Sequence, residues 1–271
     1  MFDTLIVTPL LNALFAIYGV IPGHDFGVSV IILTLIIRFA LWPLTSKQLH
    51  SQKKMTALQP DIAKLKAEAA GDKQKENQLL MELYKEKEIN PFSACLPLLL
   101  QFPFLIALFF VFKKASLPID QVASSLYPAV KNLPFIQSLI TNQTAYNPTL
   151  FGLIPMAKPS IFLAAIAAIT QFIQVKMIAP KNVDPGDQQA KMTATMNYMF
   201  PALTMFIAIS LPAALPLYWS TANSVAILQQ WLIMRGEVEK MEEAEVVEET
   251  PSRKALPKPK KKPAAKKKRK K

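Results

Sequence analysis

The chain has 271 residues, of which 51% are hydrophobic, and its mean hydropathy is positive, a balance that is high for a soluble protein and typical of a membrane protein. Its single cysteine, Cys95, excludes an intrachain disulfide and a multi-cysteine metal site, and its two histidines are far apart in sequence, so we expect neither a metal nor another cofactor. The net charge of +12 is due to residues 251–271, which hold 12 of the 31 basic residues and no acidic residue.

The N-terminal residues 1–27 contain an apolar segment, 5–21, that is interrupted by Pro9 and Asn12. No Lys or Arg precedes this segment, whereas a secretory signal begins with basic residues. We therefore predict an extracytoplasmic amphipathic helix that lies in the membrane interface, with a sixth membrane span as the alternative.

Five further apolar stretches predict transmembrane helices. Each has at least 18 residues and at most one charge, which is too long for a strand, and none alternates as a membrane β-barrel strand does. We predict an all-α integral membrane protein with a five-helix core over residues 28–235. The stretches are 28–46, 94–112, 159–179, 194–211 and 213–234.

The distribution of lysines predicts how the chain crosses the membrane. The 47–93 loop has nine lysines and the 180–193 loop two, whereas the link between the last two stretches has none. Positive residues favour the cytoplasmic side, so we expect the 47–93 loop and the C-terminus inside and the N-terminus outside. Lys113 and Lys114, which begin the extracytoplasmic loop 113–158, run against this trend.

Two segments of the 47–93 loop have the apolar spacing of helices. They flank Gly71-Asp72, a natural turn, so we predict an antiparallel helical hairpin in the cytoplasm. Its nine lysines are nearly balanced by seven acids, which by itself describes an ordinary solvated hairpin.

The cytoplasmic tail, 236–271, is first acidic and then basic. Residues 237–249 hold seven glutamates and are expected to extend the last helix, whereas 251–271 cannot bury a core and are expected to be disordered. Such a basic segment binds polyanions, either RNA or anionic lipid. Its candidate binding residues are Lys260, Lys261, Lys262, Lys266, Lys267, Lys268, Arg269, Lys270 and Lys271.

Arg38 is the only charged residue of the 28–46 stretch. At about 1.5 Å per residue it lies about 15 Å from the start of the stretch and about 12 Å from its end. A charge at that depth costs roughly 2.5–3.5 kcal/mol, and the five stretches contain no Asp or Glu to pair with it. We therefore predict a hydrated, functional cavity around Arg38, with Thr34 on the same helix face.

Uncharged polar residues on the other stretches can line this cavity. The same groups often only join helices, and Trp219 and Trp231 can be interfacial anchors. A catalytic role is not expected, because the sequence has no intramembrane Asp pair, no His beside a membrane Ser, and neither an HExxH nor a Walker A motif. The polar candidates are Gln101, Gln171, Gln174, Asn197, Ser220, Thr221, Asn223, Gln229 and Gln230.

Three segments resemble the YidC/Oxa/Alb membrane protein insertase family. Residues 79–109 lead from a lysine-rich hairpin through Tyr84-Lys85 and Asn90-Pro91 into a Cys-Leu-Pro-rich helix. Residues 170–177 are similar to the end of the family's middle helix, and 196–233 to its last two helices, with Leu-Tyr-Trp and Gln-Gln-Trp elements. The resemblance covers about residues 28–235.

The resemblance implies a hydrophilic groove in the inner leaflet that holds water around one arginine and is closed toward the outside. Arg38 falls on that arginine, Thr34 lies one turn before it, and Gln174 and Trp219 match groove positions. Gln101, Gln171, Tyr218 and Asn223 are further groove candidates. The hairpin is similar to one thought to receive substrates, here through Lys53, Lys54, Lys64, Lys85 and Lys87.

The function implied is that of an insertase of the bacterial inner membrane. It would act on nascent membrane proteins in the lipid bilayer, alone or with the Sec translocon, and basic tails in some members bind ribosomes. We expect a short form without the large extracytoplasmic domain, its anchor helix or a lipobox cysteine. The loop 113–158 has no clear family counterpart.

Two other functions remain open at the level of sequence. A channel or small-solute transporter would use Arg38 as an anion site, although the chain shows no second, repeat-related half. A non-translocating assembly chaperone would bind membrane helices without moving polar segments.

Overall fold

The computed structural model describes residues 1–87, 96–143, 146–179 and 188–248, and it is mostly helical, which confirms the predicted all-α class. By its internal contacts the chain divides into two units, Met1–Leu232 and Ile233–Lys271. The described part of the second unit continues the last helix through the acidic segment to Glu248.

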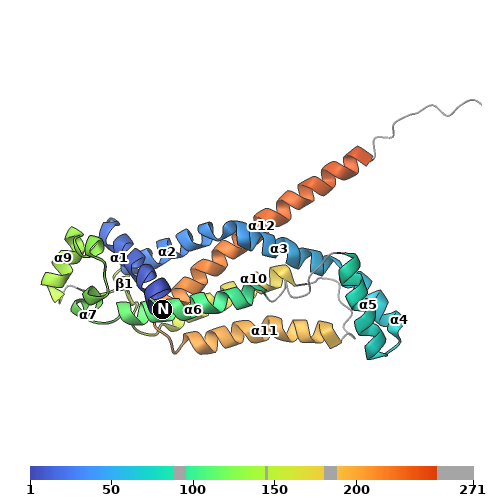
Figure 1. Cartoon of the computed structure of the whole chain (residues 1–271), viewed down its shortest axis with the longest axis horizontal. Helices are drawn as coiled ribbons and strands as arrows, with labels where there is room; N and C mark the ends of the chain where they lie inside the picture. Colours follow the sequence, from blue (N-terminus) through green and yellow to red (C-terminus); the bar gives the residue numbers. More distant parts are fainter. Residues whose placement is uncertain (88–95, 144–145, 180–187, 249–271) are drawn as a thin grey trace, which may run out of the picture. The chain divides into compact units, whose positions relative to one another are not determined.

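The first half of the chain folds into a π-helical turn and six α-helices (Figure 1). Their bounds are η1 Asp3–Val7, α1 Thr8–Val20, α2 Phe26–Ala40, α3 Trp42–Ala57, α4 Gln59–Ala69, α5 Lys73–Glu86 and α6 Leu96–Ala115. The second half adds α7 Ile119–Ser124, α8 Pro128–Lys131, α9 Pro134–Thr141, β1 Thr149–Leu150, β2 Ile154–Pro155, α10 Ile161–Ile178, α11 Gln188–Ala208 and α12 Ala214–Glu248.

The stretch predicted as one helix over 28–46 is bent in the structure. α2 ends at Ala40, α3 begins at Trp42, and the two helices are bent by 65°. Pro43 lies in the first turn of α3, where a proline without an N–H is tolerated but does not continue a preceding helix. The 28–46 stretch is therefore not one continuous helix, and α3 continues into the 47–93 loop as far as Ala57. That the stretch crosses the membrane stays a prediction.

Length and composition identify fewer membrane spans than the five predicted. Among the described residues, α10 and the continuous helix Asp3–Val20 are each long and apolar enough to cross a membrane, and α2 with α3 is a third if the bent pair counts as one span. The other predicted spans correspond to the helices α6, α11 and α12. The five-span count and the interfacial position of residues 1–27 both stay predictions.

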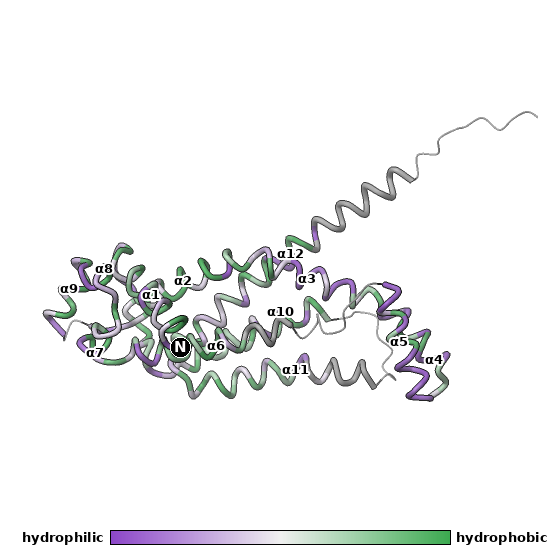
Figure 2. Tube along the Cα trace, in the orientation of Figure 1, coloured by the Kyte–Doolittle hydropathy of each residue, from purple (hydrophilic) through white to green (hydrophobic). Residues whose placement is uncertain are grey.

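The predicted helical hairpin is formed by α4 and α5, which pack against each other and are largely hydrophilic (Figure 2). Ala70 and Gly71 have φ values of 51° and 90°, so the turn uses the left-handed region. Asp72 then caps α5, because its carboxylate accepts hydrogen bonds from the N–H groups of Gln74 and Lys75.

The loop 113–158 is folded onto the N-terminal helix. We call η1, α1, α7, α8 and α9 the N-terminal bundle, in which α1 packs against α8 and α9 and also contacts α2 and α6. Its core includes Phe15 and Tyr18 of α1, whose rings contact each other and the rings of Phe26 in α2 and Tyr146. Burial and the nearby Tyr18 raise the pKa of the Tyr146 phenol, which stays a neutral donor to the Ala115 carbonyl.

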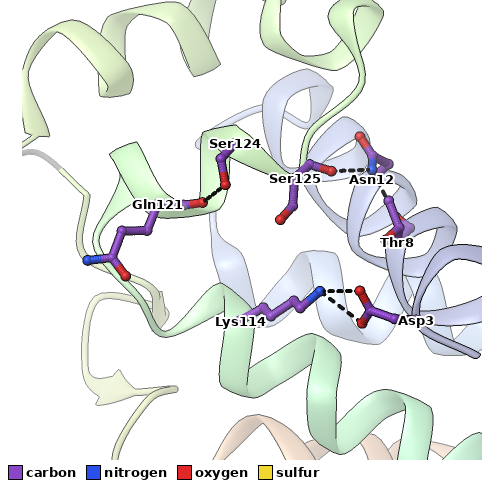
Figure 3. Close-up of polar contacts among 7 residues, drawn as sticks. All are labelled: Asp3, Thr8, Asn12, Lys114, Gln121, Ser124 and Ser125. Atoms are coloured by element: carbon purple, nitrogen blue, oxygen red, sulfur yellow. Dashed lines mark hydrogen bonds and ion pairs between the residues drawn. The ribbon is translucent and has the colours of Figure 1, made fainter.

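Two polar contacts attach the N-terminal helix to its neighbours (Figure 3). Lys114 at the end of α6 pairs with Asp3, with Nζ 2.8 Å from Oδ2. The buried Asn12 donates to the carbonyls of Thr8 and Ser125 and accepts from the N–H of Tyr127. The ion pair also accounts for Lys114 on the predicted extracytoplasmic side, where lysines are disfavoured, because Asp3 neutralises its charge locally.

We expect Asp3→Asn to lower the free energy of unfolding by less than about 1 kcal/mol, because an ion pair that solvent reaches contributes little. The two side chains are 60% and 29% exposed. Thermal unfolding in detergent at low and high salt measures the effect, with Lys113→Gln as the control at the neighbouring lysine. A loss of several kcal/mol would contradict this estimate.

The short β-hairpin packs against the start of α2. A Cβ added at Gly27 would lie 2.9 Å from the backbone Cα of Leu150, whereas one at Gly19 would meet only side-chain atoms of Leu133 and Ile136. We expect Gly27→Ala to destabilise the protein by about 1–3 kcal/mol, because backbone atoms cannot move aside. Gly19→Ala is the matched control in thermal unfolding, and an equal or larger loss there would contradict the prediction.

Candidate functional site

Arg38 lies in the last turn of α2, two residues before the helix ends at Ala40. It is half-buried, and its electrostatic partner is Tyr218 of α12, which is 4% exposed. The bend after Ala40 places the carbonyl end of α2 close to the charge, and that end of a helix dipole favours a cation by about 0.3–1 kcal/mol. Arg38 therefore lies at the end of a helix and not in the middle of a straight one.

The charge of Arg38 has no acidic partner in the described part of the chain. Ion pairs there include those of Lys64 with Asp61, Lys87 with Glu86 and Lys114 with Asp3. Thr34 shares the α2 face with Arg38, but it is 2% exposed and its hydroxyl donates to the Val30 carbonyl at 2.7 Å. Thr34 is thus satisfied by its own helix and leaves the guanidinium available.

The structure places Tyr218 and Trp219 together near the start of α12, where Tyr218 is buried and Trp219 packs half-buried against the core. Asn223 lies one turn further along α12, and its place in a groove stays a prediction. Its Nδ2 donates to Thr170 Oγ1 at 3.3 Å and lies 3.5 Å from the Ala167 carbonyl. Asn223 therefore joins α12 to α10.

A second polar contact joins α12 to α3 just beyond the bend. Gln229 Nε2 donates to Thr45 Oγ1 at 3.0 Å and to the Trp42 carbonyl at 3.3 Å. Close by in sequence, Gln48 Nε2 and Gln230 Oε1 are buried without a hydrogen-bond partner in the described structure. Such buried polar atoms cost about 1–3 kcal/mol each unless water or another molecule satisfies them.

Gln171 and Gln174 of α10 line a pocket of about 300 Å³ that does not include Arg38. Asn197 of α11 lines it as well, with Gln52, Thr56 and Gln59 from α3 and the start of α4. None of the residues found to line it is charged. Lys176, the charged residue of α10, instead lies over the ring of Phe172, with Nζ 5.5 Å from the centroid.

A row of uncharged polar residues on α3 runs from the bend toward this pocket. Those on α3 are spaced three or four residues apart and so share one helix face, and Gln59 follows them at the start of α4: Thr45, Gln48, Gln52, Thr56 and Gln59. We call this row the α3 polar stripe. The stripe was not predicted from the sequence, because the lysines between its members are typical of a solvated loop, although the spacing of its members is a signal for it.

The remaining candidates are only partly described. The side chain of Gln101 and the tail residues 249–271 lie outside the description. Lys53 and Lys54 lie on α3, Lys64 on α4 and Lys85 on α5, with Lys87 just after it. Among the described residues, no group of three His, Cys, Asp or Glu side chains is placed to hold a metal ion.

Comparison with known proteins identifies relatives along most of the chain. The family "60Kd inner membrane protein" matches residues 16–241. The chain is 36% identical over 233 residues to "Membrane protein insertase YidC" of Rickettsia rickettsii (strain Sheila Smith), and 35% identical to the protein of that name from Rickettsia conorii. These matches cover 84% of this chain but 38% of each relative, so the chain spans well under half of their length.

A solved structure has a similar fold. It is described as "Active YidC insertase crystal structure with the first transmembrane domain resolved", and it matches with a TM-score of 0.52 and 22% sequence identity. The match covers 76% of this chain and 41% of that one. At this identity the similarity concerns the fold alone.

Proposed function

Since the chain belongs to the 60 kDa inner membrane protein family and is a multi-pass membrane protein, we propose that it is an insertase of the bacterial inner membrane. It inserts nascent membrane proteins into the bilayer, alone or with the Sec translocon, and helps them fold. The observation that carries the proposal is Arg38, a cation at the bend between α2 and α3 that has no acidic partner among the residues that the structure describes.

Arg38 acts on the polar segment that a substrate must move across the membrane. At an effective dielectric of about 20, a guanidinium 4 Å from a carboxylate attracts it by roughly 4 kcal/mol. An acidic segment is therefore drawn in and held there without its full hydration shell. A permanent internal salt bridge would cancel this attraction, so the lack of an acidic partner for Arg38 in the described part of the chain supports a transient role.

The α3 polar stripe and the neighbouring pocket support a path for the same segment. Carboxamides both donate and accept hydrogen bonds, so Gln52, Gln59 and Gln174 suit the peptide groups of any sequence. Gln48 Nε2 and Gln230 Oε1, which are buried without a hydrogen-bond partner among the described residues, are one donor and one acceptor, as in a peptide group. A path of this kind lowers the cost of removing water from the peptide groups of the substrate, and it does not select substrates by their charge.

The free energy for insertion comes from the substrate itself. Each methylene that moves from water into the bilayer contributes about 0.8 kcal/mol, so a hydrophobic segment of ordinary length needs no nucleotide. The cytoplasmic hairpin receives the substrate through Lys64 and Lys85, together with the flanking lysines Lys53 and Lys54 on α3 and Lys87 just after α5. Its exposed ion pairs, such as Lys64 with Asp61, are weak enough to exchange for contacts with a partner.

The purified chain in liposomes tests the proposal when it is given a small single-span substrate. We expect the outer segment of the substrate to become protected from added protease. Binding of the substrate without protection would indicate an assembly chaperone, and anion flux through the same vesicles without protection would indicate a channel. Either result would overturn the insertase proposal.

We expect deletion of residues 251–271 to weaken ribosome co-sedimentation by about tenfold or more near 0.1 M salt, because the tail contributes 12 positive charges. The effect should shrink as the salt concentration rises. A scrambled tail of the same composition is the control and should bind as well as the original. Undiminished co-sedimentation of the deletion variant would contradict ribosome binding by the tail, whose charge would then serve anionic lipid or another partner.

A further inference from the structure

The turn between β1 and β2 exposes two large apolar side chains. Phe151 is 69% exposed and Leu153 is 82% exposed, and between them lies Gly152. Phe151 has a φ of 53°, a conformation that bulky residues rarely adopt. Turn tips that face water normally have Asn, Asp or Gly at such positions, so an aromatic residue here indicates that the tip does not face water.

The hairpin that holds this tip is fixed to three helices at the ends where they begin. The N–H of Phe151 donates to the carboxylate of Asp25, which caps α2, and Leu150 is packed on Gly27. The chain after β2 then hydrogen-bonds to the start of α12, with Ala213 N 2.9 Å from the Lys158 carbonyl. Three residues after Lys158, α10 begins.

The length of α10 gives the level of the tip relative to the bilayer. Its 18 residues span about 27 Å, close to the thickness of the hydrocarbon core. Its first residues, Ile161 and Phe162, are 72% and 63% exposed, as expected of apolar side chains that face lipid. Phe151 and Leu153 precede these two residues in the chain. Their hairpin also contacts the starts of α2 and α12, so we expect the tip to lie at the same membrane interface as the start of α10.

We propose that the tip Phe151–Leu153 is a membrane anchor that inserts into the lipid on the side where α2, α10 and α12 begin. The occupant of this apolar surface is lipid, because the tip continues the exposed apolar surface at the start of α10. The anchor fixes the depth at which the starts of α2 and α12 sit. It is independent of whether the chain inserts substrates.

A fluorescent probe on a single cysteine tests the anchor. Cys95 is first replaced by serine, and the environment-sensitive dye NBD is attached at Leu153→Cys or Phe151→Cys in the full chain. Gln121→Cys on α7, an exposed polar position, is the matched control. The protein is reconstituted in phosphatidylethanolamine and phosphatidylglycerol vesicles, some with lipids that carry a nitroxide quencher high on the acyl chain.

We expect the probes at 151 and 153 to emit at shorter wavelength than the probe at 121. They should also be quenched by the lipid nitroxide and protected from aqueous iodide. Iodide quenching at 151 and 153 equal to that at 121 would overturn the proposal. A blue-shifted emission that the lipid nitroxide does not quench would also overturn it, because protein would then cover the tip.

Discussion

Arg38→Ala is expected to reduce insertion of substrates with acidic outer segments by about tenfold, while substrates with neutral outer segments insert nearly as before. A tenfold loss corresponds to about 1.4 kcal/mol, well within the roughly 4 kcal/mol that a close carboxylate gains from the guanidinium. Protease protection of matched substrates in liposomes that differ only in an Asp or Asn in the outer segment measures the effect.

Three controls separate this electrostatic role from a structural one. Arg38→Lys keeps the charge and should retain most of the activity, whereas Lys176→Ala removes another intramembrane charge that lies over Phe172 and should have little effect. Because Arg38 has no ion pair in the described structure, its removal should leave the thermal unfolding temperature nearly unchanged. An equal loss for acidic and neutral substrates would refute the electrostatic role.

The sequence predicted the helices well because their signals are local. Apolar length identified α6, α10, α11 and α12, and a Gly-Asp turn between two amphipathic segments identified the α4–α5 hairpin. The bend at Ala40 was missed because Pro43 lies inside an apolar run, where a membrane helix tolerates proline. Whether such a proline bends the chain depends on tertiary contacts, such as the bond from Gln229 to Thr45.

The site residues were harder to assign than the helices. Asn223 and Gln174 are both amides on predicted spans, but Asn223 joins two helices and Gln174 lines a pocket. The two roles depend on the neighbouring helix, which sequence periodicity does not reveal. Arg38 could be identified from sequence because the free-energy cost of a charge in an apolar segment is large. That cost can be recognised without knowing how the helices pack.

Asn12 illustrates the same limit at the N-terminus. In the sequence it is a polar interruption of an apolar helix, and this favoured an interfacial position over a membrane span. In the structure it is 3% exposed and binds the backbone of the segment between α7 and α8, at Ser125 and Tyr127. The side chain thus holds the N-terminal bundle together. This role could not be predicted from the sequence, because its partners are far from Asn12 along the chain.

Asn12→Leu is expected to lower the free energy of unfolding by about 2–4 kcal/mol, because it leaves the Tyr127 N–H and the Ser125 carbonyl without the partner that now binds them. Asn12→Asp keeps the acceptor for Tyr127 but removes the donor for Ser125, so its loss should also be large. Thermal or denaturant unfolding in detergent measures both, with Asn132→Ala, at an exposed position, as the control. If Asn12→Leu unfolded at the temperature of the unchanged protein, apolar packing alone would hold the bundle, and the loop 113–158 would need no polar attachment to α1.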